Sequence, residues 1–148
     1  MISIEHAPEL DTLPISTDAI RRLLTQVIAE QSEQSVKALT IVFGTHTLVR
    51  SLNVQYLDHD YNTDVLAFNL SDAPDELEGE VYVDVETARE RHGEFDTSVD
   101  AEIARYAVHG VLHLLGHTDK TEEGQAAMRQ LEDQYVQGFT NTADTPPA

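Results

Sequence analysis

Residues 109–119 have the sequence HGVLHLLGHTD, and this stretch is the most informative part of the chain for its fold and its function. His109 and His113 are four residues apart, so a helix places both imidazoles on one face, one turn apart. Gly116 is the residue type that most often ends a helix in a left-handed turn. Such a turn brings Asp119 back toward the two histidines. The stretch therefore predicts three ligands for one divalent metal ion.

The predicted ligands indicate a catalytic rather than a structural site for one Zn²⁺ per chain. Three protein ligands leave the fourth position of a tetrahedral zinc ion open for water. The spacing also matches the frame HxxxHxxGxxH of the metzincin proteases, with Asp119 in place of the third histidine. Gly110 stands where those proteases carry the glutamate that acts as general base. Because glycine cannot move a proton, a peptidase of that kind is not expected.

Two neighbouring features leave the third ligand open to alternatives. His117 lies four residues beyond His113, so an unbroken helix would make His117 the ligand instead. His117 is also a candidate for protonating a leaving oxygen from beside the metal. Asp119 has a rival role, because Asp119 with Glu122 fits the N-terminal capping box of a following helix, and Thr121 is an alternative cap. A cap and a metal ligand lie in much the same place, so the two roles do not exclude each other.

The same stretch resembles the signature HGxLHLxG[YH]xH of the YbeY family of bacterial endoribonucleases. Asp119 replaces the last histidine of that signature, as it does in one branch of the family. Two further segments are similar to the family, LNVQYLDHDYNTDVLAF at residues 52–68 and GEVYVD at residues 79–84. The resemblance therefore covers about residues 53–128. Direct matches to the signature are His109, Gly110, Leu112, His113, Leu114 and Gly116.

The resemblance implies a zinc-dependent endoribonuclease that cleaves single-stranded RNA. The implied role is maturation of ribosomal RNA, especially at the 3′ end of the small-subunit RNA, and ribosome quality control. The implied ligands are His109, His113 and Asp119, while no general base is identifiable. The expected partner is ribosomal RNA presented on the ribosome, without a DNA or membrane partner. Two alternatives stay open: a metal-dependent hydrolase of another substrate, and a non-catalytic ribosome-assembly factor that metal stabilises.

One position departs from the family. Many members carry an arginine immediately after the tyrosine that corresponds to Tyr56, and this arginine is thought to handle the RNA phosphate. Here the position is Leu57. That task then falls to another cation or to none, and His59 and Lys120 are the cations nearby in the sequence.

The composition limits the class of protein. The 148 residues suit one domain, expected at residues 1–139, followed by a disordered tail at residues 140–148 that ends DTPPA. The chain has no cysteine, which excludes disulfides and thiolate ligands. No apolar run approaches the ~20 residues that span a bilayer, and no signal peptide is recognisable, so we expect a cytoplasmic protein.

The net charge is unusual for a nuclease. The chain has 27 acidic and 9 basic residues, a formal net charge of −18, which repels nucleic acid at long range. High salt would shorten this repulsion, because the Debye length falls to ~3 Å at 1 M. Presentation of the RNA by a partner such as the ribosome would also overcome it. A solvated acidic surface unrelated to function is the third interpretation.

Hydrophobic periodicity predicts an α+β fold. The family resemblance implies a small mixed sheet of about four strands covered by helices, with a zincin-like helix that carries the two histidines. Residues 63–64 open a strand and are interpreted equally as turn residues or as part of a site. We expect Glu80 and Asp84 on the surface of their strand, and His46 in no functional cluster. Strands are predicted at residues 2–5, 38–43, 65–70 and 79–85, and helices at 16–34, 45–56, 86–91, 98–115 and 121–136.

Overall fold

The computed structural model describes residues 1–10, 15–57, 63–95, 97–137 and 139. The tail at residues 140–148 and the segment 58–62, which contains His59, lie outside the described residues. The elements follow one another as β1 (Ile2–His6), α1 (Thr17–Gln31), β2 (Ser35–Gly44), α2 (His46–Leu57), β3 (Val65–Asn69), β4 (Glu76–Asp84), α3 (Val85–Arg91), η1 (His92–Phe95), α4 (Val99–Leu114) and α5 (Glu122–Gln137).

The four strands form one mixed sheet in the order β1-β2-β4-β3. β1 and β4 both pair in parallel with β2, whereas β3 is antiparallel to β4. Side chains of β4 alternate along the strand: Leu77, Val81 and Val83 are buried, while Glu78 and Glu80 are half-exposed on the opposite face. The mixed four-stranded sheet with helices confirms the predicted α+β fold.

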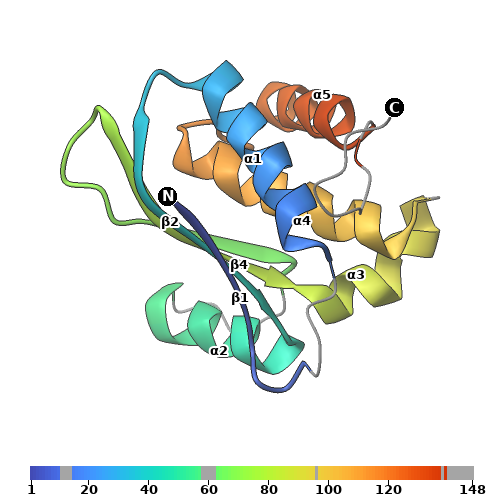
Figure 1. Cartoon of the computed structure of the whole chain (residues 1–148). Coiled ribbons are helices and arrows are strands. Elements are labelled where there is room, and N and C mark those ends of the chain that lie inside the picture. The colour runs from blue at the N-terminus through green and yellow to red at the C-terminus, as the bar shows by residue number, and fades with distance from the viewer. Residues whose placement is uncertain (11–14, 58–62, 96, 138, 140–148) are drawn as a thin grey trace.

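Helices cover the two faces of the sheet unequally (Figure 1). α1, α4 and α5 lie on one face, and α2 lies on the other. α4 is the most enclosed helix, because it contacts β3 and β4 beneath it as well as α1, α3 and α5. The hydrophobic core therefore lies between the sheet and α1 and α4, and the two histidines of the motif sit on the helix that this core fixes most firmly.

Local sequence signals explain where the helices begin. Ser16 accepts a hydrogen bond from the backbone N–H of Ala19 at 3.2 Å and caps α1. Thr45 accepts from the N–H of Leu48 at 3.3 Å and caps α2 in the same way. These caps satisfy backbone donors that have no partner within the helix.

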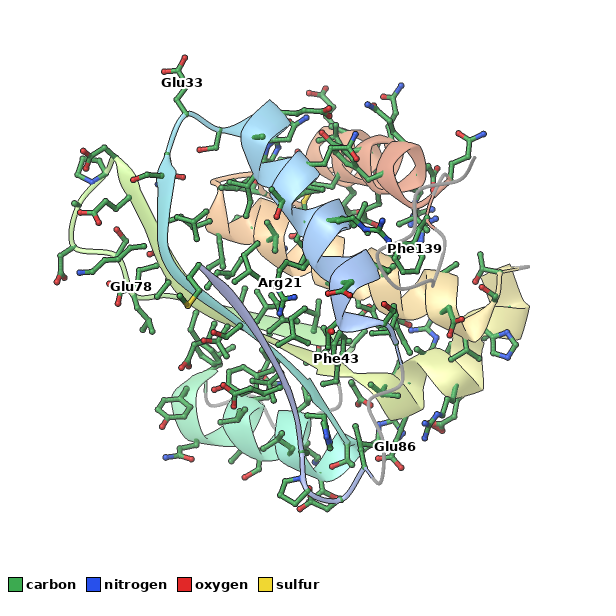
Figure 2. All side chains as sticks on the ribbon, viewed as in Figure 1. Arg21, Glu33, Phe43, Glu78, Glu86 and Phe139 are labelled. Carbon is green, nitrogen blue, oxygen red and sulfur yellow. The ribbon has the colours of Figure 1, made fainter. Side chains whose placement is uncertain are left out.

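The core is made by apolar stripes at helical and strand spacing. Phe43 of β2 is fully buried, and Figure 2 shows it in the middle of the molecule, whereas Glu33 projects away from it. The apolar side chains of α1 that recur at helical spacing are all buried, namely Ile20, Leu23, Leu24, Val27 and Ile28. No helix in the described part of the chain is both long and apolar enough to cross a membrane.

Candidate metal centre

α4 presents His109 and His113 on one face, as the four-residue spacing predicts. The Nε2 atoms of the two rings are 3.0 Å apart, and the ring centroids are 4.6 Å apart. Both side chains are half-buried, so they can be reached from solvent while the rest of α4 is packed. The two nitrogens that could bind a metal therefore face each other rather than the protein interior.

Gly116 ends α4 in the predicted left-handed turn. Its φ is +99°, a value that residues with a Cβ rarely adopt. The N–H of Gly116 donates to the carbonyl of His113 at 3.1 Å, and the N–H of His117 donates to the carbonyl of Leu112 at 3.0 Å. This pair of bonds is the Schellman motif, which reverses the chain at a helix end. The reversal brings Asp119 to the histidines.

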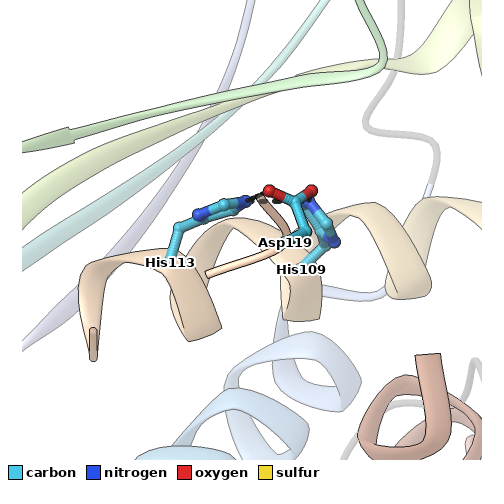
Figure 3. A group of neighbouring side chains, drawn as sticks. All are labelled: His109, His113 and Asp119. Carbon is cyan, nitrogen blue, oxygen red and sulfur yellow. Dashed lines mark hydrogen bonds and ion pairs between the residues drawn. The ribbon is translucent and has the colours of Figure 1, made fainter. Parts of the chain in front are cut away.

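Asp119 completes a group of three possible ligands (Figure 3). One carboxylate oxygen lies 3.5 Å from Nε2 of His109, and the other lies 3.6 Å from Nε2 of His113. The donor atoms of the three residues all lie within 4.8 Å of one another. The sequence prediction that these residues meet at one point is therefore in accord with their positions.

The separations of these donor atoms fit one small divalent ion. Ligand bonds of 2.0–2.1 Å in a tetrahedral zinc site place neighbouring donors roughly 3.3 Å apart. The two imidazole nitrogens are 3.0 Å apart, and each lies 3.5 or 3.6 Å from a different oxygen of Asp119, so all three separations are close to this value. Two imidazole nitrogens and one carboxylate are also the donor types that zinc accepts in catalytic sites. The residues present therefore fit a metal ion.

Glu132 of α5 orients the first histidine, and this contact has no signal in the local sequence. Its Oε2 lies 2.6 Å from Nδ1 of His109. Such a carboxylate fixes the tautomer so that Nε2 carries the lone pair, and it makes the ring a stronger ligand. Glu132 is itself buried and is held by Arg105, whose guanidinium lies 3.4 Å from the other carboxylate oxygen.

The two histidines differ in their protonation behaviour. Burial lowers the pKa of His109, but the hydrogen bond and charge of Glu132 outweigh burial and leave the pKa above its ordinary value. Burial and the neighbouring His109 lower the pKa of His113. A lowered pKa favours the neutral ring of His113, which has a lone pair to offer to a metal ion. The two rings therefore differ in how readily they are protonated, because Glu132 contacts His109 and the charge of His109 disfavours a proton on His113.

The contacts around α5 bear on the rival roles of the neighbouring residues. Thr121, not Asp119, caps this helix, because Oγ1 of Thr121 accepts from the N–H of Gly124 at 3.0 Å. The carboxylate of Asp119 is consequently available to the histidines, while its backbone carbonyl accepts from Nε2 of Gln125 at 3.1 Å. Among the described residues, His117 does not belong to the group of three.

Gly110 has a packing role that the comparison with proteases did not suggest. It is buried on the side of α4 that faces the sheet, and a Cβ there would lie 2.5 Å from Cγ1 of Val81 and 3.0 Å from Cγ2 of Val65. Real Cβ atoms do not approach neighbours so closely, so a glutamate at this position does not fit. The absence of the protease base thus follows from how closely the helix approaches the sheet.

A cavity of about 470 Å³ opens beside the candidate metal centre, between α4 and α5. Asp64, which the sequence left undecided, lines this cavity, and burial raises the pKa of its carboxyl. Leu57 ends α2 as an exposed apolar residue, and Lys120 is exposed next to Asp119. The cavity is lined by Asp64, Arg91, Thr97, Glu102, Arg105, Tyr106, His109, Asp119, Gln125, Met128, Arg129, Glu132 and Asp133.

A second histidine–carboxylate cluster corrects two expectations. Asp84 is not a surface residue but fully buried, because it ends β4 and caps α3 through a 3.0 Å bond from the N–H of Thr87. His46 is not isolated either: its Nδ1 lies 2.6 Å from Asp84, and its Nε2 contacts Glu90. Glu86 accepts from the backbone N–H of His46 at 2.8 Å. The alternation of side chains along β4 predicts a surface position for Asp84. That prediction is wrong because α3 begins at the next residue and buries the aspartate that caps it.

Comparison with known proteins identifies relatives over most of the chain. The sequence profile of the family described as Endoribonuclease YbeY matches residues 6–140. An endoribonuclease YbeY of Salinibacter ruber is 46% identical over 143 residues, which cover 91% of this chain and 89% of the relative. One of Flavobacterium psychrophilum is 31% identical over 139 residues and covers 94% and 96%. The solution structure of TM1509 from Thermotoga maritima has the same fold, with a TM-score of 0.64 at 24% identity over 93% of this chain and 87% of that one.

Proposed function

The chain belongs to the family of YbeY endoribonucleases, and from that premise we propose that it hydrolyses single-stranded RNA at a metal ion held by His109, His113 and Asp119. The single observation that carries the proposal is the convergence of these three donors at separations that suit one ion. The family supports a nuclease, and the geometry supports metal-assisted hydrolysis as its chemistry.

We assign the ion as Zn²⁺, one per chain, because two imidazoles and a carboxylate are typical of catalytic zinc. When bound, such an ion polarises a phosphoryl oxygen and lowers the pKa of a water molecule to about 7. Asp119 in place of a third histidine adds one negative charge to the ligand set. This charge weakens the Lewis acidity of the site relative to a site with three histidines.

The side chains around the ligands hold the site in shape. Glu132 fixes the ring of His109 through Nδ1, and Arg105 fixes Glu132 in turn. Tyr106 and Met128 are buried and form part of the cavity wall beside these polar groups. His117 follows the helix end directly and is our candidate for protonating the leaving oxygen. No residue is assigned as general base.

The biological substrate in this proposal is ribosomal RNA, cleaved at the 3′ end of the small-subunit RNA during maturation and quality control in the cytoplasm. The net charge of −18 supports presentation by the ribosome, since free RNA is repelled at long range. RNA that the ribosome already holds in place does not have to be captured from solution, so the long-range repulsion no longer prevents binding.

One observation favours a second candidate function. Leu57 is an exposed apolar residue, where many family members carry an arginine, and it offers no charge to a phosphate. A ribosome-assembly factor in which the metal only stabilises the fold would need no such charge. Retention of ribosome maturation in a variant that is folded but free of metal would favour this candidate over catalysis.

The test of the proposed function combines metal content with RNA cleavage. Protein purified without tag or chelator should contain about one zinc ion per chain by elemental analysis. The same preparation should cleave single-stranded RNA, and a chelator should abolish cleavage until zinc is restored. A preparation that carries metal and leaves RNA intact would contradict the proposal.

A further inference from the structure

We propose that Arg129 forms a binding subsite for an RNA phosphate in the cavity beside the metal centre. This inference rests on the proposed function, because it names the group that holds the substrate of that same site. Arg129 was not singled out by the motif, and it lies outside the stretch that resembles the family signature.

The position of Arg129 follows from its two neighbours along α5. Gln125, one turn earlier, donates to the backbone carbonyl of Asp119 at 3.1 Å. Glu132, one turn later, contacts Nδ1 of His109 at 2.6 Å. Residues three and four apart share a face of a helix, so Arg129 lies between two side chains that touch the metal-binding residues. It lines the cavity of about 470 Å³ that these residues border.

The three arginines of the cavity differ in what they already bind. Arg105 is surrounded by Glu102, Glu132 and Asp133 at 3.5, 3.4 and 2.8 Å. Its charge is therefore used inside the protein, where it holds the carboxylates in place.

The other two arginines are more exposed. Arg91 pairs with Glu94 at 3.1 Å. Arg129 is exposed and makes no ion pair with any residue in the described ranges. Of the cavity's three guanidinium groups, that of Arg129 is therefore the one whose hydrogen-bond donors are left for a ligand.

The charge inside the cavity permits an anion to enter. Five carboxylates and three arginines line it. A divalent ion at the adjacent centre would add two positive charges, so the numbers of positive and negative charges would be equal. The chain as a whole carries −18. A phosphate therefore meets a neutral region here, although the rest of the surface repels it.

A guanidinium suits this task better than any other side chain. Its planar fork donates two parallel hydrogen bonds to two phosphate oxygens, and it stays charged at every relevant pH. The buried Met128 one position earlier fixes the helix face from which the side chain extends. We infer that Arg129 holds a phosphate of the RNA backbone and so places the chain against the metal centre.

The test measures equilibrium binding of a short fluorescein-labelled single-stranded RNA that carries 2′-O-methyl riboses and phosphorothioate linkages, which resist cleavage. Zinc-loaded wild type is compared with Arg129→Gln, Arg129→Lys and the control Arg89→Gln. Arg89 is exposed on α3 and does not line the cavity. The control therefore removes the same charge from elsewhere on the surface.

Arg129→Gln should raise the Kd about tenfold, the effect of one lost charge-assisted contact, while Arg89→Gln should change it less than about twofold. The slope of log K against log salt should fall by about 0.7 in Arg129→Gln alone, because one phosphate contact is gone. Arg129→Lys should keep the slope, since it keeps the charge. A structural role would not produce this pattern.

Equal Kd values and equal salt slopes for Arg129→Gln and Arg89→Gln would overturn the subsite. So would failure of wild type to bind the RNA. Failure of zinc-loaded wild type to cleave ordinary RNA would instead overturn the proposed function, because binding is scored on RNA that resists cleavage. Melting temperatures equal to wild type are expected for all variants, since each change is at an exposed residue.

Discussion

Two clusters in this molecule combine histidine with carboxylates, and they are built for different tasks. In both groups the possible donor atoms lie within 4.8 Å of one another: His109, His113 and Asp119 in one, His46, Asp84 and Glu86 in the other. In the first cluster, the Nε2 atoms of His109 and His113 face each other, so one metal ion could bind to both. In the second, each nitrogen of one ring already faces a carboxylate.

The histidines of the two clusters lie at helix ends of opposite sign. His113 lies in the last turn of α4, and the negative end of a helix dipole favours a cation there. His46 begins α2 and Asp84 caps α3, so two positive helix ends meet at the second cluster and favour its carboxylates instead. Similar residue types thus form a candidate metal site in the first cluster, and hydrogen bonds and ion pairs that connect α2 to α3 in the second.

The largest expected effect separates the two clusters by metal content. His113→Ala should reduce bound zinc from about one ion per chain to almost none and abolish RNA cleavage, because two ligands hold the ion poorly. The matched variant His46→Ala should keep the ion and the activity. Elemental analysis and RNA cleavage check both variants. Loss of metal in His46→Ala as well would show that the two clusters are not distinct.

A smaller effect is expected from the carboxylate behind each histidine. Glu132→Gln removes the charge that orients His109 and should weaken zinc affinity by about 10–100-fold. Glu90→Gln makes the same chemical change at a contact of His46 and should leave zinc affinity unchanged. Competition with a zinc-binding dye gives both affinities. Equal affinities in the two variants would remove Glu132 from the metal centre.

The second cluster should show its role in stability rather than in metal binding. Asp84→Ala removes the cap of α3 and the buried partner of His46, and should lower the free energy of unfolding by about 2 kcal/mol. Asp84→Asn keeps a capping oxygen and should lose less. Urea unfolding measures the change, with zinc content as the control that should not move. A large loss of zinc would connect the clusters after all.

The smallest effect is a dependence of stability on pH. Burial lowers the pKa of His46, but the hydrogen bonds and charges of Asp84 and Glu90 outweigh burial and raise it. A raised pKa in the folded state means that the stabilisation is complete below about pH 6.5 and is lost as the pH rises through the folded value. The loss should be about 1 kcal/mol or less, since His46 is partly exposed.

Unfolding curves of wild type and His46→Gln across this pH range check the prediction. Glu86 also faces His46 through its backbone N–H, and it is present in both proteins. The stability difference between the two proteins should therefore shrink as the pH rises. A difference that stays constant with pH would mean that His46 does not change its charge on folding.

Much of the fold could be predicted because local patterns and tertiary structure agree. In α1 the apolar residues at helical spacing face the core, and Ser16 caps the helix as its side-chain chemistry predicts. Gly116 ends α4 because a left-handed residue is needed there. The meeting of His109, His113 and Asp119 follows from helix spacing and this one turn.

The parts that could not be predicted depend on contacts between distant segments. Glu132 reaches His109 only because α5 folds back along α4, and no local pattern in α5 distinguishes it from the other acidic residues. His46 likewise meets Asp84 across 38 residues of chain. For Asp84 a signal existed, since an aspartate just before a helical segment is a typical cap, but strand alternation was given more weight.

The order of the strands has a consequence for how the protein is made. β4 lies between β2 and β3 in the sheet, so the edge of β2 opposite β1 has its full partner strand only once residue 84 has been synthesised. The proposed ligands and their supporting carboxylate all come later, at residues 109–132. All residues of the sheet therefore precede the proposed ligands in the chain, and a fragment that ends before residue 109 would contain the four strands but none of the three proposed metal ligands.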